Sequence, residues 1–261
     1  QIFGKEHPYG YNSDIQDYRQ LTIEDLKTCF ATWYTPSNCR LIACGNIDEA
    51  TIRQLDQLFG HDPRTGPVPS SQSRVTTAAP RSLRIPRADA LQSAVKIGRR
   101  AFSRQHPDAE GLFVLNTILG GYFGSRLMTN IREKKGYTYN IYSTLDTLLH
   151  DGCFYIATEV SPEKAQAAVR AIFSEMKKLR TQPVGPEELA MVRNYLLGML
   201  LNGLDGPLNT SDVVRSYILE DTPFDKFDSL VHTIQTIDAT RLQELANVYL
   251  RKEDFWTVVV G

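Results

Sequence analysis

The segment 61–88 constrains the fold most, because it divides the chain into two parts that differ in pattern. It contains five prolines, at positions 63, 67, 69, 80 and 86, together with many serines and threonines and almost no apolar periodicity. Such a composition is typical of a connecting segment on a protein surface. We therefore expect a short first part (1–60), a linker (61–88) and a large second part (89–261).

The first part has the pattern of a helix, a strand and a second helix. Thr22 is a hydroxyl N-cap with Asp25 at the third helical position, and the helix that follows is expected to end before Pro36. The apolar run 39–45 ends in glycine and predicts a buried strand. Asp48 then caps a helix that we expect to reach residue 58.

The second part combines strands with many helices. We expect strands over 93–98, 137–144, 152–158 and 255–260, and helices after Pro107 and over 125–134, 162–179, 186–204, 211–219, 224–234 and 239–250. Helices in bulk beside a mostly antiparallel sheet indicate an α+β fold.

One sequence pattern occurs twice. Residues 21–45 and 236–261 each show a helix that ends in tyrosine, a short turn and an apolar strand that ends in glycine. Repetition of such a unit indicates a duplicated architecture, of which this chain would hold the second half. Because the chain opens inside one copy and lacks an initiator methionine, we expect it to be a fragment or a processed product.

The charge balance and the cysteines exclude several classes of protein. The 29 basic and 30 acidic residues give a net charge of -1, so no overall field attracts nucleic acid or an anionic membrane. No apolar run of about 18 residues is present, and we expect no membrane association. The four cysteines form no C-x-x-C pair, which favours reduced thiols and a cytoplasmic location, although a periplasmic or mitochondrial compartment remains open.

The common catalytic and cofactor motifs are absent. The five histidines are scattered, so the chain by itself predicts no metal site. The glycine-rich stretch 119–125 has leucine where the dinucleotide motif needs its first glycine, which disfavours nucleotide binding. Its glycines either present main-chain N–H groups to an extended ligand or only turn one helix into the next, and the sequence leaves both readings open.

The strongest local signal follows this loop. A helix over 125–134 ends at Gly136, and an alternating Tyr-Thr-Tyr pattern begins a strand. Arg132 lies near the helix end and Tyr139 on the strand that turns back beside it, so both side chains can reach one cleft. A guanidinium and a phenol are good donors to peptide carbonyls or to a developing oxyanion.

Several motifs in the chain occur in the same order in one known family. They are His7-Pro8-Tyr9-Gly10, Leu21 to Leu26, Tyr34 to Asn38, Cys44 to Asp48, Gly120 to Leu127, Ile131-Arg132-Glu133 and Gly136 to Tyr139. This order resembles the pitrilysin/insulinase family of zinc peptidases, which includes the mitochondrial processing peptidases and the respiratory-complex core subunits derived from them. The resemblance covers nearly the whole chain: residues 1–60 resemble the end of the first module, and 89–261 resemble the second.

The resemblance implies a division of labour between two modules. Active members carry an inverted H-x-x-E-H zinc motif in the first module, and this sequence does not contain it. The chain is therefore expected to bind no cofactor itself, with zinc held by an N-terminal module or a partner subunit. The family's substrate-contacting Arg and Tyr match Arg132 and Tyr139, which are the expected catalytic residues. The loop residues Gly120, Gly121, Phe123, Gly124 and Ser125 are expected to bind substrate.

Two functions follow from the resemblance. In the first, the chain is the substrate-binding half of a zinc endopeptidase that acts on extended peptides in a closed chamber and is inactive alone. In the second, it is a non-catalytic partner or structural subunit of a homodimer, heterodimer or larger complex. The presence or absence of H-x-x-E-H upstream discriminates between them.

Overall fold

The computed structural model describes residues 1–67 and 79–261, and the chain divides into two compact units. Among the described residues, one unit contains 1–2, 79–202 and 217–261, and the other contains 3–67 and 203–216. Of the predicted linker 61–88, residues 68–78 lie outside the described residues, and a short strand not expected from the sequence, β1 (Ser82–Ile85), forms within the rest. The predicted boundaries of the two parts stay a prediction.

The larger unit is built on a sheet of five strands in the order β1-β5-β2-β4-β3. The strands are β1, β2 (Ser93–Arg100), β3 (Ile141–Thr147), β4 (Gly152–Val160) and β5 (Trp256–Val260). Only β1 and β5 run parallel, while β5, β2, β4 and β3 pair antiparallel in turn. The expected α+β fold with a mostly antiparallel sheet is confirmed.

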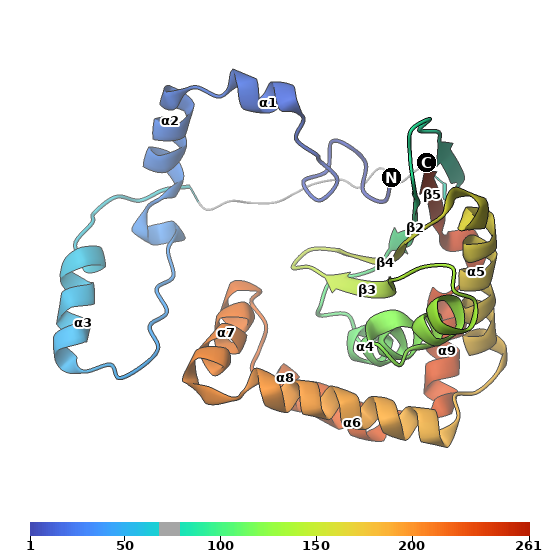
Figure 1. Cartoon of the computed structure of the whole chain (residues 1–261). Coiled ribbons are helices and arrows are strands. Elements are labelled where there is room, and N and C mark those ends of the chain that lie inside the picture. The colour runs from blue at the N-terminus through green and yellow to red at the C-terminus, as the bar shows by residue number, and fades with distance from the viewer. Residues whose placement is uncertain (68–78) are drawn as a thin grey trace. The chain divides into compact units, whose positions relative to one another are not determined.

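Helices cover one face of this sheet (Figure 1). They are α4 (Ala109–Asn116), which continues into the π-helical η3 (Thr117–Gly121), α5 (Ala165–Thr181) and α9 (Ala239–Tyr249). Alternate strand residues supply the core beneath them: Val95, Ile97, Ile141 and Ile156 are each fully buried. The helices α6 (Pro186–Gly203), α7 (Gly206–Leu219) and α8 (Asp225–Thr236) follow α5 in the chain.

The opposite face of the sheet carries polar and small side chains. Lys96 on β2, Ala157 on β4 and Tyr142 on β3 lie in one row across the three strands. Lys96 and Tyr142 are exposed. Because strand side chains alternate between faces, burial of Ile97 and Ile141 under the helices places these residues on the open side.

The smaller unit consists of short helices and includes most of α7. Its other elements are α1 (Ile15–Gln20), α2 (Ile23–Trp33), the 3-10 turn η1 (Pro36–Asn38), α3 (Glu49–Leu55) and the π-helical η2 (Asp56–Gly60). Thr22 and Asp25 form the expected capping box at the start of α2. None of these five elements contains a buried residue, and the apolar side chains of α2 are exposed.

The strand expected over 39–45 is wrong for this structure. Residues 39–44 form no strand in the part of the chain that the structure describes. A strand exists only where its main-chain N–H and C=O groups meet those of a neighbour, and the described residues of the smaller unit offer none.

Candidate substrate-contact site

Arg132 and Tyr139 lie side by side near the start of β3. Arg132 is on the π-helical segment η4 (Met128–Lys134), where the sequence predicted an ordinary helix, and its Cζ lies 5.5 Å from the centroid of the Tyr139 ring. The same Cζ lies 4.6 Å from the centroid of Phe123. The guanidinium therefore makes cation–π contacts with two aromatic rings, from the glycine-rich loop and from the segment before β3.

Tyr139 does not lie on a strand, contrary to the sequence prediction. The strand predicted over 137–144 begins only at Ile141, and Tyr139 belongs to the segment that joins η4 to β3. Its side chain is 88% exposed. The expected meeting of Arg132 and Tyr139 is nevertheless observed.

The end of η4 fixes the position of Arg132. Ile131 is fully buried and anchors this turn in the core. The N–H of Gly136 donates to the carbonyl of Arg132 at 3.0 Å, and the N–H of Tyr137 donates to the carbonyl of Ile131 at 3.1 Å. Gly136 has φ of 61°, a left-handed conformation that glycine adopts without strain, so it ends the helix as the sequence predicted.

Two arginines of this region differ in their partners. Arg126 donates two hydrogen bonds to Glu188, at 2.8 and 2.7 Å, and this pairing raises the pKa of Arg126. Within residues 1–67 and 79–261, the side chain of Arg132 makes no hydrogen bond and no ion pair. Arg126 therefore ties the turn before η4 to α6, whereas the five N–H groups of Arg132 are available to a ligand.

The glycine-rich loop presents some of its predicted residues and buries others. Gly121, Phe123 and Gly124 are exposed and lie at the surface. Gly120 and Ser125 are buried. A Cβ on Gly120 would lie 2.6 Å from the Oγ of Ser143, so this glycine permits close packing of η3 on β3. Substrate binding by the loop stays a prediction.

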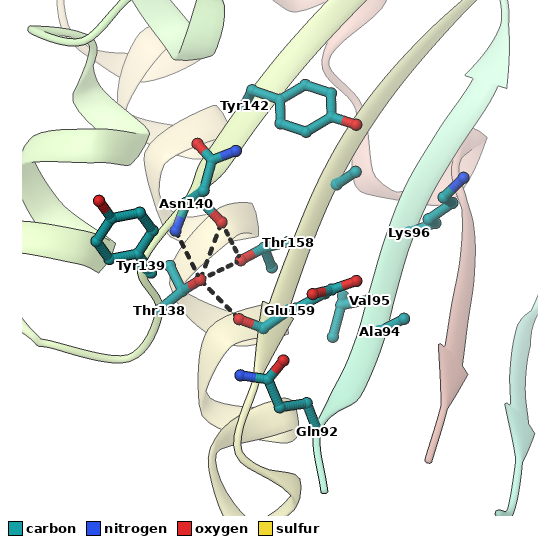
Figure 2. A pocket seen from close by; sticks show the side chains of 11 residues that line it. Gln92, Ala94, Val95, Lys96, Thr138, Tyr139, Asn140, Tyr142, Thr158 and Glu159 are labelled. Carbon is teal, nitrogen blue, oxygen red and sulfur yellow. Dashed lines mark hydrogen bonds between the residues drawn. The ribbon is translucent and has the colours of Figure 1, made fainter. Parts of the chain in front are cut away.

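A cavity of about 510 Å³ opens beside Tyr139 on the polar face of the sheet (Figure 2). Its lining combines hydroxyl and amide groups with two charged residues of opposite sign, Lys96 and Glu159. The remaining lining residues are Gln92, Ala94, Val95, Thr138, Tyr139, Asn140, Tyr142, Ala157 and Thr158. The site as a whole can donate hydrogen bonds to an extended polar chain from Arg132, Tyr139 and this cavity.

Sequence reasoning missed most of the cavity, because its residues come from three strands and from the segments that precede two of them. Thr138 and Thr158 are 20 positions apart, yet their hydroxyl oxygens lie 3.0 Å from each other. The sequence did contain one signal for this cavity, namely polar residues at alternate strand positions, such as Lys96. Such residues mark the face of a sheet that helices leave uncovered.

The described residues do not form a metal site. Among them, no group of three or more His, Cys, Asp or Glu residues is placed to hold an ion. The residues present therefore do not fit zinc. No described helix combines the length and the apolar character that crossing a bilayer requires.

Comparison with known families identifies this arrangement. Residues 20–196 match the family model described as the peptidase M16 inactive domain. The chain belongs to this family. The resemblance to zinc peptidases of the pitrilysin/insulinase type is confirmed, and the match extends from α2 to α6, across η4 and the sheet face beside it.

Relatives of this M16 inactive domain include proteins named as proteases and as non-peptidases. An uncharacterized zinc protease of Mycobacterium tuberculosis is 27% identical over 100% of this chain and 60% of its own length. A non-peptidase homolog of Helicobacter pylori is 23% identical over 94% of this chain and 57% of its own length. The chain thus spans about 60% of the length of the curated relatives it matches.

A solved structure confirms the fold. The crystal structure of a peptidase M16 inactive domain from Pseudomonas fluorescens superposes with a TM-score of 0.85 at 20% identity, over 100% of this chain and 63% of that one. At this identity the likeness shows the architecture alone.

Proposed function

We propose that this M16 inactive domain is the substrate-binding half of a zinc-dependent endopeptidase that acts on extended peptides, and that it does not cleave peptides alone. The observation that carries the proposal is the meeting of Arg132 and Tyr139, with the Arg132 guanidinium held by two aromatic rings and engaged by no carboxylate of the described residues. An arginine inside a salt bridge would have to give up that partner before it could bind a peptide.

The two side chains have distinct roles in this proposal. Arg132 donates to carbonyl oxygens of the bound peptide and carries the positive charge that a developing oxyanion needs. The Tyr139 hydroxyl donates to a neighbouring carbonyl and fixes the peptide's orientation. Zinc supplies the activation of water in this family, and it belongs to the N-terminal module or to a partner subunit.

The smaller unit supports the proposed partner. The apolar side chains of α2 are exposed, with Leu26 and Phe30 each 56% exposed. Residues 39–44, where the sequence predicted a strand, have no neighbouring strand among the described residues. An exposed apolar helix face beside an unpaired segment is typical of a surface that another module covers. We assign that surface to the zinc-binding module.

The test measures turnover of a fluorogenic peptide of about 20 residues by the native polypeptide or complex that contains this chain, with and without a chelator. Arg132→Ala and Tyr139→Phe are each expected to lower kcat/KM by roughly 10- to 1,000-fold, the range for losing one transition-state donor. Arg170→Ala on α5 and Tyr18→Phe on α1 are matched controls, because both side chains are exposed and lie on other elements. Unchanged kcat/KM in both site variants would contradict the proposal.

A second function is supported by one comparison. The Helicobacter pylori relative is named a non-peptidase homolog, so the fold also occurs in a protein without assigned peptidase activity. In that case the chain completes a chamber or scaffolds a complex. Absence of chelator-sensitive cleavage by the native assembly, together with absence of H-x-x-E-H from it, would favour this alternative.

A further inference from the structure

The exposed position of Tyr139 requires an explanation, because strand geometry alone would place its side chain elsewhere. The antiparallel pairing of β3 with β4 begins at Ile141 opposite Thr158. If the pairing continued by the same register, Asn140 would lie opposite Glu159. Tyr139 would then share a face with Ile141, which is fully buried beneath the helices. Tyr139 can reach Arg132 only because the ladder stops.

The hydroxyl of Thr138 occupies the place where the ladder would continue. It donates to the carbonyl of Glu159 at 2.6 Å and accepts from the N–H of Asn140 at 3.1 Å. These two main-chain groups belong to the residues that a longer ladder would place opposite each other. The side chain thus satisfies both groups and removes the need for further strand pairing.

A second hydroxyl holds the same turn from the other side. Thr158 is buried, and its Oγ1 donates to the carbonyl of Asn140 at 2.8 Å. With one proton on each hydroxyl, Thr138 can serve Glu159 while Thr158 serves Asn140, so the network is satisfied without competition. Figure 2 shows both threonines joined to Asn140, with the Tyr139 ring on the side away from Lys96 and β2.

We propose that Thr138 is a positioning residue: its hydroxyl ends the pairing of β3 with β4 at Ile141 and so holds Tyr139 outside the sheet, beside Arg132. The effect on catalysis rests on the proposed function, whereas the effect on the position of Tyr139 does not. Without the hydroxyl, Asn140 N–H and Glu159 C=O satisfy each other by lengthening the ladder, and Tyr139 turns toward the buried face.

The first experiment measures the position of Tyr139 directly, by its rate of nitration with tetranitromethane, mapped by mass spectrometry. Tyr18, which is 63% exposed on α1, is the reference in the same molecule. In Thr138→Val the rate of Tyr139 relative to Tyr18 is expected to fall roughly 3- to 10-fold, the population shift for losing one hydrogen bond. Thr138→Ser keeps the hydroxyl and is expected to restore the rate.

An unchanged relative rate in Thr138→Val would overturn the proposal. If Thr138→Val does not fold, as judged by its melting temperature against that of Thr138→Ser, Thr138→Ala replaces it, because it removes the same hydroxyl. A fall in the relative nitration rate of Tyr139 in Thr138→Ala supports the proposal, and an unchanged rate overturns it.

The second experiment separates this proposal from the proposed function. In the native assembly, Thr138→Val is expected to lower kcat/KM as Tyr139→Ala does, and to add no further loss in the Tyr139→Ala background. A further loss in that background would contradict action through Tyr139. If Tyr139→Ala leaves kcat/KM unchanged while Thr138→Val slows nitration, the substrate role of Tyr139 is wrong and the positioning role stands. If Tyr139→Ala lowers kcat/KM and Thr138→Val leaves the nitration rate of Tyr139 unchanged, the substrate role of Tyr139 stands and the positioning role of Thr138 is wrong.

Discussion

Replacing Gly120 with alanine tests whether this glycine serves packing or substrate binding. Its added Cβ would lie 2.6 Å from Ser143 Oγ, 2.7 Å from the Ser143 main-chain nitrogen and 2.9 Å from a methyl carbon of Leu127. The hydroxyl and the methyl group can rotate away, but the nitrogen belongs to β3. To restore an ordinary contact of 3.4 Å, η3 and β3 must separate by about 0.7 Å, the difference between 3.4 and 2.7 Å.

Such overpacking costs about 1–3 kcal/mol in a closely packed core. Gly121→Ala is the matched control, because it lies in the same π-helical turn, gains the same helix propensity and has its nearest neighbour at 3.3 Å. The difference between the two variants therefore isolates the close approach to Ser143. With a slope of roughly 2 kcal/mol per M urea, the midpoint of Gly120→Ala should lie about 0.5–1.5 M below that of Gly121→Ala.

The assay is urea unfolding followed by tryptophan fluorescence. The chain has two tryptophans, and Trp33→Phe leaves Trp256, which is buried on β5 and reports the larger unit. Equal midpoints for the two alanine variants would refute the packing argument. Loss of peptide turnover in the native assembly at equal midpoints would instead support contact of Gly120 with substrate.

Three further predictions follow from the same structure. Burial, followed by the charge of Asp146, raises the pKa of the Cys153 thiol to about 11, so about 0.1% of this thiol is ionised at pH 8. Because the thiolate is the reactive form, iodoacetamide should label the exposed Cys29 before Cys153, as mass spectrometry would show. Burial and the hydrogen bond to Asp108 raise the pKa of Tyr249 to about 12, above the unfolded value of about 10. This stabilisation is complete below pH 10 and is lost toward pH 12, so urea midpoints should fall more steeply there in the wild type than in Tyr249→Phe. The amides of residues 41–44 should exchange rapidly with deuterium in this chain and slowly once the zinc-binding module is bound; equal rates would contradict a shared sheet.

Local patterns in the sequence predicted most elements of the larger unit. Periodicity placed β2, β4 and β5 and the helices α5, α6, α8 and α9 within a few residues of their observed bounds, because each contributes apolar side chains to the core. The π-helical geometry of η4 was not predictable, since an extra residue in a turn leaves the apolar spacing of Leu127 and Ile131 almost unchanged.

The candidate site was predicted in part. The order of motifs indicated Arg132 and Tyr139, and the structure brings them together. Thr138 was not predicted, because its role depends on the carbonyl of Glu159, which is 21 positions away in the chain. Periodicity describes which face a residue occupies and carries no information about where a ladder stops, so the alternation over 137–144 overestimated the strand by four residues at its start.

The repeated pattern shows how far a strand depends on its neighbours. Residues 236–261 and 21–45 share the same order of helix, tyrosine, turn and apolar run. In the first, the run forms β5, which lies between β1 and β2 and pairs with both. In the second, the run 39–44 meets no strand in the part of the chain described, and it forms no strand itself. Equal local propensity thus has two outcomes, and the missing factor is an acceptor sheet, which the proposed zinc-binding module would supply.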